Sequence, residues 1–301
     1  MIEVDSVSTW YGSFRALSNV TFTARPGSVT GLLGRNGAGK SSLLRTLAGC
    51  MAFEGSIRLS GVSLRSDPIG AKKLIGYLPE RAPLYSELTV AEQLRFAAQV
   101  KSVSRAELES VVKGMAGRCG LSDRLDILIR QLSHGYRQRV GMAQALIGDP
   151  EILLLDEPTA ALDPRQASEM RALIRAAAAG STVILSTHLL SEAEALCSDL
   201  LVLESGAIKA ADSVLSVRGA TRTVDLHLSE PVGERAQDAL AALGSVERVD
   251  GSLHLRVTLF GGVESVHLFD WAVQEGVRVS AIIPRRSPLE ELFAGDGDGH
   301  V

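Results

Sequence analysis

The chain has 301 residues, which is enough for one large domain and one small one. Its net charge of −4 gives no reason to expect a nucleic-acid-binding surface, which needs clustered lysine and arginine. The apolar runs are far shorter than the roughly 20 residues that cross a bilayer, the N-terminus lacks the pattern of a secretory signal, and the three cysteines are too scattered for a disulfide framework. If the protein acts at a membrane, we expect another chain to cross it.

The first half of the chain reads as a series of strands followed by helices. Alternating or short apolar runs predict strands at 2–7, 20–24, 29–33, 55–59 and 74–78. A helix begins near Gly39, directly after the third of these strands. Further on, helical spacing of apolar residues predicts two helices within 91–119 and another over 133–147.

The next segment alternates strictly between strand and helix. Strands are expected at 152–155, 183–186 and 200–203, and helices at 165–179 and 191–196. Alternation of this kind is typical of an α/β fold, with a mostly parallel sheet and helices on its faces.

A second pattern begins near residue 220, after a shift towards acidic composition. Its order is strand, helix, strand, strand, helix, strand, which fits a small ferredoxin-like α+β domain. In the second helix, over 263–273, we expect Val266, Phe269 and Val273 to point inward. The predicted organisation is a first domain at 1–215, an accessory α+β domain at 220–294 and a disordered tail at 295–301.

The strongest motif is a glycine-rich turn at 34–42 between a strand and a helix. It matches G-x-x-x-x-G-K-[ST] in the context that a phosphate-binding loop requires. Its glycines allow backbone N–H groups to converge on a phosphate, its lysine would reach the β- and γ-phosphates, and its first serine would bind Mg²⁺. The predicted binding residues are Gly34, Arg35, Asn36, Gly37, Ala38, Gly39, Lys40, Ser41 and Ser42.

A second motif is an acidic pair at the end of the apolar strand 152–155. Asp156 is placed to bind Mg²⁺, and Glu157 to take a proton from an attacking water. Alone, the pair has an ordinary alternative, a core strand that ends in a surface acidic pair. The phosphate-loop motif upstream favours the functional interpretation.

A third motif, Leu132-Ser133-His134-Gly135-Tyr136, makes the resemblance specific. The chain resembles the ATP-binding-cassette (ABC) family, which carries an L-S-G-G-Q-type motif at this distance before its acidic strand. Leu132, Ser133 and Gly135 match that motif, whereas His134 and Tyr136 depart from it. Without the other motifs, Ser133 would be read simply as a helix cap.

Other residues match the family's pattern by position. Tyr11 matches the aromatic on which adenine stacks, Asp163 lies in the family's D-loop, and His188 matches the switch histidine that contacts the γ-phosphate. Glu80 stands where the family has a glutamine, and a carboxylate there would still bind Mg²⁺. Taken singly, Tyr11 is also explained as a half-exposed strand aromatic and His188 as a hydrogen-bonded histidine at a strand end.

The resemblance covers about residues 1–215 and implies a function. It implies a P-loop NTPase cassette of α/β class, with a mixed sheet, an antiparallel β subdomain and a helical subdomain at about 84–147. It implies binding and hydrolysis of ATP with Mg²⁺, with Glu157 and His188 as the catalytic residues. Two copies would close on ATP, so that Ser133 and Gly135 of one copy complete the site of the other.

The resemblance also implies where the protein works. The variant motifs are similar to those of type 2 ABC exporters, so we expect a peripheral subunit at the cytoplasmic face of the membrane that drives an integral permease. The region 84–122, with Glu80 as hinge, is expected to contact that permease. No nucleic acid is expected as a partner.

Two alternatives stay open at this point. A soluble ABC-type ATPase that transports nothing is disfavoured, because the chain has one nucleotide motif rather than two in tandem, no long coiled-coil insertion and no basic stripe. The C-terminal domain has a second interpretation as a regulatory domain that binds a small molecule, although its sequence identifies no pocket.

Overall fold

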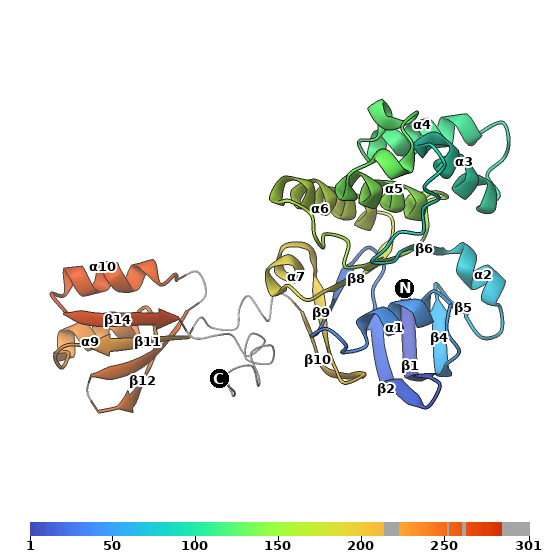
Figure 1. Cartoon of the computed structure of the whole chain (residues 1–301). Coiled ribbons are helices and arrows are strands. Elements are labelled where there is room, and N and C mark those ends of the chain that lie inside the picture. Colours follow the sequence, from blue (N-terminus) through green and yellow to red (C-terminus); the bar gives the residue numbers. More distant parts are fainter. Residues whose placement is uncertain (214–222, 252, 261–262, 285–301) are drawn as a thin grey trace. The chain divides into compact units, whose positions relative to one another are not determined.

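The computed structural model describes residues 1–213, 223–251, 253–260 and 263–284 (Figure 1). The chain divides into two compact units, Met1–Ser213 and Val214–Val301. The division falls close to residue 215, where the sequence predicts a domain boundary. The predicted tail at 295–301 lies outside the described residues.

Unit 1 contains two sheets. One is antiparallel, with strand order β2-β1-β4-β5. The other has the order β10-β9-β3-β8-β7-β6; its neighbours pair in parallel except β10 and β9, which are antiparallel. The strands are β1 (Ile2–Tyr11), β2 (Phe14–Ala24), β3 (Val29–Leu33), β4 (Glu54–Leu59), β5 (Val62–Ser63), β6 (Ile75–Leu78), β7 (Ile152–Asp156), β8 (Thr182–Thr187), β9 (Asp199–Glu204) and β10 (Ala207–Ser213).

The helices of unit 1 lie at several places around its two sheets (Figure 1). In Figure 1, α3, α4 and α5 lie together at one end of the unit, and α1 lies beside the antiparallel sheet at the other end. The structure therefore has the expected mixed sheet, antiparallel β subdomain and helical subdomain. The helices are α1 (Lys40–Leu47), α2 (Pro68–Lys73), α3 (Val90–Val100), α4 (Leu108–Arg118), α5 (His134–Leu146), α6 (Pro164–Ala178) and α7 (Leu190–Leu196), with short 3₁₀ turns η1 (Ser122–Arg124) and η2 (Ile129–Gln131).

The sequence pattern missed several short elements. Strand β2 begins at Phe14 rather than at residue 20, because a tight turn at Gly12 (φ 58°) brings its first half back onto β1. Helix α2 has only six residues, too few for a periodicity signal, and depends on its cap: the Asp67 side chain accepts a hydrogen bond from Gly70 N, and Pro68 occupies the first turn. Strands β5 and β10 were also not expected.

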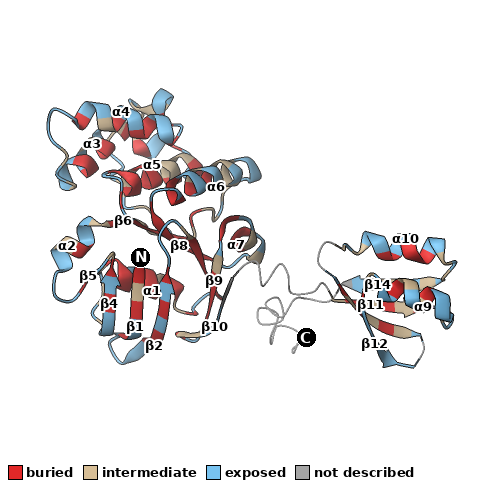
Figure 2. Cartoon of the chain, turned by 180° about the vertical axis from the view of Figure 1, so that it is seen from behind, coloured by how far each residue is buried: buried red, intermediate tan, exposed pale blue. Residues whose placement is uncertain are grey.

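The core of unit 1 explains the apolar runs of the sequence. All residues of β3, β7 and β8 are buried, as expected for central strands covered on both faces (Figure 2). These three strands are adjacent and parallel, so their carboxyl ends meet at one edge of the sheet. The crevice outside the carboxyl ends of parallel strands is where α/β proteins bind ligands.

Unit 2 has the order of elements that the sequence predicts. Its four-stranded sheet is antiparallel throughout, with order β12-β13-β11-β14, and α9 and α10 pack on it through an apolar core. The elements are β11 (Thr223–Leu228), α9 (Glu234–Ala241), β12 (Gly244–Asp250), β13 (His254–Leu259), α10 (Val266–Gln274) and β14 (Val279–Pro284).

The predicted inward face of α10 is wrong. Val266, Phe269 and Val273 are 52%, 57% and 82% exposed. The buried face instead carries Leu268 and Trp271, and the indole Nε1 of Trp271 donates to the Ala236 carbonyl at 2.9 Å. Both faces are apolar at helical spacing, so periodicity could not choose between them. Burial of the large indole with a satisfied N–H favours the observed face.

No helix in the described ranges combines the length and the apolarity that spanning a bilayer requires.

Candidate active site

The turn between β3 and α1 needs glycine for its shape. Gly37 and Gly39 have φ of 83° and 107°, in the region that other residues rarely adopt. A Cβ on Gly39 would also lie 3.0 Å from the Ala16 carbonyl oxygen. Helix α1 begins directly after this turn, and no side chain caps its N-terminus. Its first N–H groups therefore form a site suited to an anion.

Lys40 places a buried positive charge at this turn. Its side chain is 7% exposed, and Nζ donates to the carbonyl oxygens of Gly34 at 2.7 Å and Arg35 at 3.3 Å. Nζ also lies 3.6 Å from Oε1 of Glu157. The ammonium is thus held between the phosphate-loop backbone and the acidic end of β7.

Asp156 connects the same loop to the sheet edge. It is 2% exposed at the end of β7, and its Oδ1 accepts hydrogen bonds from Ser41 Oγ at 3.1 Å and Ser186 Oγ at 2.6 Å. Parallel pairing of β7 with β8 places Asp156 beside Ser186. The structure therefore brings together the serine and the aspartate that the sequence predicts as Mg²⁺ ligands.

Glu157 is held in an unusual backbone conformation. Its φ is 48°, and its N–H donates to Ser186 Oγ at 3.0 Å. Non-glycine residues with such φ values are uncommon and cluster at functional sites. The carboxylate Oε2 lies 2.9 Å from His188 Nδ1. Burial raises the pKa of Glu157 above its ordinary value, while His188 and Lys40 oppose that rise.

These groups border one hollow of about 520 Å³. The loop 36–42, the strand tip at 157 and the residue after β8 all contribute to its wall. Of the predicted site residues, those that line it are Asn36, Gly37, Gly39, Lys40, Ser41, Ser42, Glu80, Glu157 and His188. Gly34 and Arg35 contribute through the carbonyls that accept from Lys40, and Asp156 through Ser41. Ala38 is buried in the turn itself.

An aromatic residue that the sequence analysis missed lines the hollow. Phe14 is 67% exposed and lies in its wall, whereas Tyr11, the predicted adenine-stacking residue, does not. The two are direct cross-strand partners at the hairpin between β1 and β2, and Tyr11 is 46% exposed. Because β2 was expected to begin only at residue 20, the pairing that brings Phe14 beside Tyr11 could not be anticipated.

Three further predicted binding residues, Ser133, Gly135 and Asp163, also lie outside this hollow. Ser133 caps α5, accepting from Tyr136 N at 3.5 Å, and Gly135 packs so closely that a Cβ there would collide with the Gln166 side chain. Asp163 caps α6, accepting from Gln166 N at 2.8 Å. Within one chain these residues therefore have structural roles, and they do not border the pocket that Lys40 and Glu157 share.

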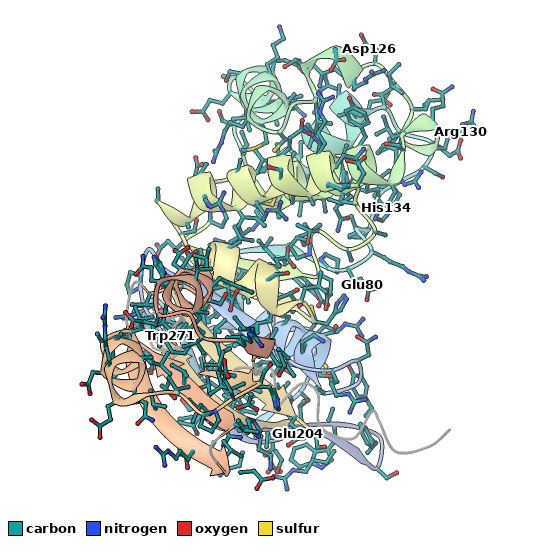
Figure 3. All side chains as sticks on the ribbon, turned by 90° about the vertical axis from the view of Figure 1, so that its left-hand side faces the viewer. Glu80, Asp126, Arg130, His134, Glu204 and Trp271 are labelled. Carbon is teal, nitrogen blue, oxygen red and sulfur yellow. The ribbon has the colours of Figure 1, made fainter. Side chains whose placement is uncertain are left out.

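The two departures from the L-S-G-G-Q pattern have local explanations. The ring of Tyr136 lies 5.2 Å and 5.7 Å from the guanidinium carbons of Arg124 and Arg139, so it contacts two cations. Nε2 of His134 lies 3.3 Å from the carbonyl oxygen of Ala160, which lines the hollow. Figure 3 labels His134 at the start of α5 and Glu80 after β6.

The donor set fits a small hard cation. Ser41 and Asp156 offer a hydroxyl and a carboxylate oxygen side by side, and Glu80 lines the same hollow. Within the described part of the chain, no three His, Cys, Asp or Glu side chains cluster as a metal site. Mg²⁺ binds through one or two carboxylates together with phosphates and water, so this sparse set suits it.

Comparisons with known proteins agree with this arrangement. The family model described as "ABC transporter" matches residues 17–160. A Nod factor export ATP-binding protein I from Paraburkholderia xenovorans is 34% identical over 83% of this chain and 82% of its own length. The Nod factor export ATP-binding protein I from Rhizobium meliloti is 38% identical over 68% of this chain, but the match spans only 62% of the length of that relative.

Solved structures show the same cassette. An ATP-binding subunit of an ABC transporter is 32% identical, with a TM-score of 0.66 over 72% of this chain and 92% of its own. A bacterial ABC transporter cassette solved as a dimer is 25% identical, with a TM-score of 0.66 over 71% of this chain and 99% of its own. The chain belongs to the family of ABC transporter ATP-binding proteins, and the predicted cassette fold is confirmed.

Proposed function

We propose that this chain hydrolyses ATP at the hollow beside Lys40 and uses the energy to drive export through a separate membrane-spanning partner. The observation that carries the proposal is the convergence of Lys40, Asp156 and Glu157 at the edge where β3, β7 and β8 end. The export direction is supported by the names of the two relatives, both Nod factor export proteins.

In this proposal each group has a distinct task in phosphoryl transfer. The loop N–H groups and Lys40 bind the phosphates, while Phe14 and Tyr11 offer aromatic surface on which the adenine ring can stack. Ser41, Asp156 and Glu80 would hold Mg²⁺, which supplies positive charge against the phosphate oxygens. Glu157 accepts a proton from the attacking water, and its raised pKa makes it a stronger base than an ordinary glutamate. His188 orients Glu157 through their 2.9 Å contact.

A second copy of the chain is part of the proposal. Ser133 and Gly135 start a helix but do not border their own chain's hollow, so their only route to a triphosphate is in another copy. The dimeric form of a solved cassette with the same fold supports this arrangement. ATP would then join two surfaces, and its hydrolysis would release them.

The helical subdomain offers a surface for the membrane partner. Tyr85, Phe96 and Val100 are 57%, 43% and 68% exposed, and the rings of Tyr85 and Phe96 meet edge to face at 5.5 Å. An exposed apolar cluster of this kind marks an interaction surface. It falls within 84–122, just after Glu80, and we propose that the permease docks there, at the cytoplasmic face of the membrane.

Photo-crosslinking tests the coupling to a membrane protein. A photoreactive residue at Phe96 or Val100 is expected to capture one integral membrane protein in native membranes. The same residue at Ile69, which is 72% exposed on α2, serves as the control and should capture little. Capture from Ile69 alone, or of no membrane protein at any position, would contradict the proposed docking surface.

A further inference from the structure

Helix α7 carries a buried carboxylate that the proposed mechanism does not use. Glu192 is 5% exposed. The hydroxyl of Thr159 donates to its Oε1, and the hydroxyl of Thr187 donates to its Oε2 at 2.6 Å. Buried carboxylates are rare unless hydrogen-bonded, because leaving water is costly for a charge. Both carboxylate oxygens of Glu192 are satisfied in this way.

The two threonines belong to the two segments that carry the catalytic pair. Thr187 ends β8 and directly precedes His188, while Thr159 follows Glu157 after the buried Pro158. The Thr187 hydroxyl also accepts from Leu189 N at 3.1 Å, so its one proton is directed to Glu192. A single carboxylate therefore ties together the strand ends that present Glu157 and His188.

Glu192 acts on the site indirectly, through other residues. It is absent from the residues that line the hollow, and its carboxylate accepts from the two threonines instead. Glu157 itself contacts Lys40 from α1 and His188 after β8.

We propose that Glu192 is a positioning residue for ATP hydrolysis. By bridging Thr159 and Thr187, it holds Glu157 and His188 in their relative positions. This inference rests on the proposed function. It assigns no contact between Glu192 and the nucleotide. Loss of the bridge therefore acts on turnover and leaves the binding of ATP by the phosphate loop in place.

The first test separates turnover from binding. Glu192→Ala is expected to lower kcat about tenfold to a hundredfold, because small displacements of reacting groups have effects of that size. The Kd for ATP, measured by calorimetry in EDTA so that none is hydrolysed, is expected to stay within about twofold, since Lys40 and the loop are intact. Glu151→Ala, an exposed carboxylate preceding β7, is the matched control and should leave both values unchanged.

The second test uses a variant that keeps the bridge. Glu192→Gln can accept from one threonine through its carbonyl and donate to the other through its amide, so we expect near-native kcat. Rescue of kcat by glutamine but not by alanine is therefore the expected result if the two hydrogen bonds position Glu157 and His188. A purely structural role of Glu192 predicts instead that kcat and the affinity for ATP fall together in Glu192→Ala.

The outcomes distinguish this inference from the proposed function. If the wild type and Glu151→Ala hydrolyse ATP and Glu192→Ala does so at the same kcat, the inference fails and the proposed function stands. An equal loss of kcat and ATP affinity in Glu192→Ala also overturns it. If the wild type itself hydrolyses no ATP, the proposed function fails. Should Glu192→Ala not fold, Thr187→Val decides the matter, because it removes one side of the bridge, and a wild-type kcat in that variant refutes the bridge.

Discussion

Replacing Glu157 by glutamine is expected to slow ATP turnover by at least about a hundredfold while ATP remains bound. The amide has nearly the shape of the carboxylate and can keep the contact with His188, but it cannot accept a proton from water. Lys40, Ser41 and Asp156 are unchanged, so the phosphate and cation contacts persist. Steady-state phosphate release and equilibrium ATP binding by the purified variant provide the two measurements.

The control for this variant is Glu151→Gln, which makes the same chemical change on an exposed residue at the opposite end of β7. It should turn over ATP at the wild-type rate. Full turnover by the Glu157→Gln protein would remove Glu157 as the base and leave its left-handed backbone without a catalytic explanation.

Lys40→Ala has the largest expected effect on nucleotide binding. The buried ammonium donates to the phosphate loop's carbonyls and lies close to Glu157. A hydrogen bond to a charged group contributes about 1.5–3 kcal/mol, so its loss should raise the Kd for ATP roughly tenfold to a hundredfold. Hydrolysis should fall with it, since the same ammonium would stabilise charge on the transferred phosphate.

Calorimetric titration with ATP, alongside a thermal unfolding scan, checks this expectation. The scan is needed because Lys40 also donates to the carbonyls of Gly34 and Arg35. Lys73→Ala removes an exposed lysine at the end of α2 and should bind ATP normally. A folded Lys40→Ala protein with wild-type affinity would show that the triphosphate lies elsewhere.

The parts of the site that could be predicted are those encoded locally. A strand, a glycine-rich turn and a helix follow one another within 29–47, so the loop is readable from consecutive residues. Asp156 and Glu157 were readable for the same reason, because an apolar strand delivers them at its tip. The two segments meet at Ser41 and Lys40 because of the order in which the parallel strands pair. The family resemblance, and not the residue pattern, indicated that they would meet.

What could not be predicted depends on how the strands pair and the helices pack. Phe14 reaches the hollow only because the β1–β2 hairpin pairs it with Tyr11. Glu192 gains its two partners because α7 lies beside the end of β8 and the segment that follows β7, a packing that the sequence pattern does not reveal. Helix α10 has two apolar faces, and the structure buries the face that carries Trp271.

The structure of the Glu157→Gln protein with ATP and Mg²⁺ tests the central claim most directly. We expect Lys40 Nζ and the loop 34–41 on the β- and γ-phosphates, with Ser41 and Asp156 at the cation. The substituted side chain at position 157 and His188 should lie beside the γ-phosphate, with Ser133 of a second copy across it. A triphosphate bound away from Lys40, or one that Asp156 and position 157 do not approach, would contradict the account.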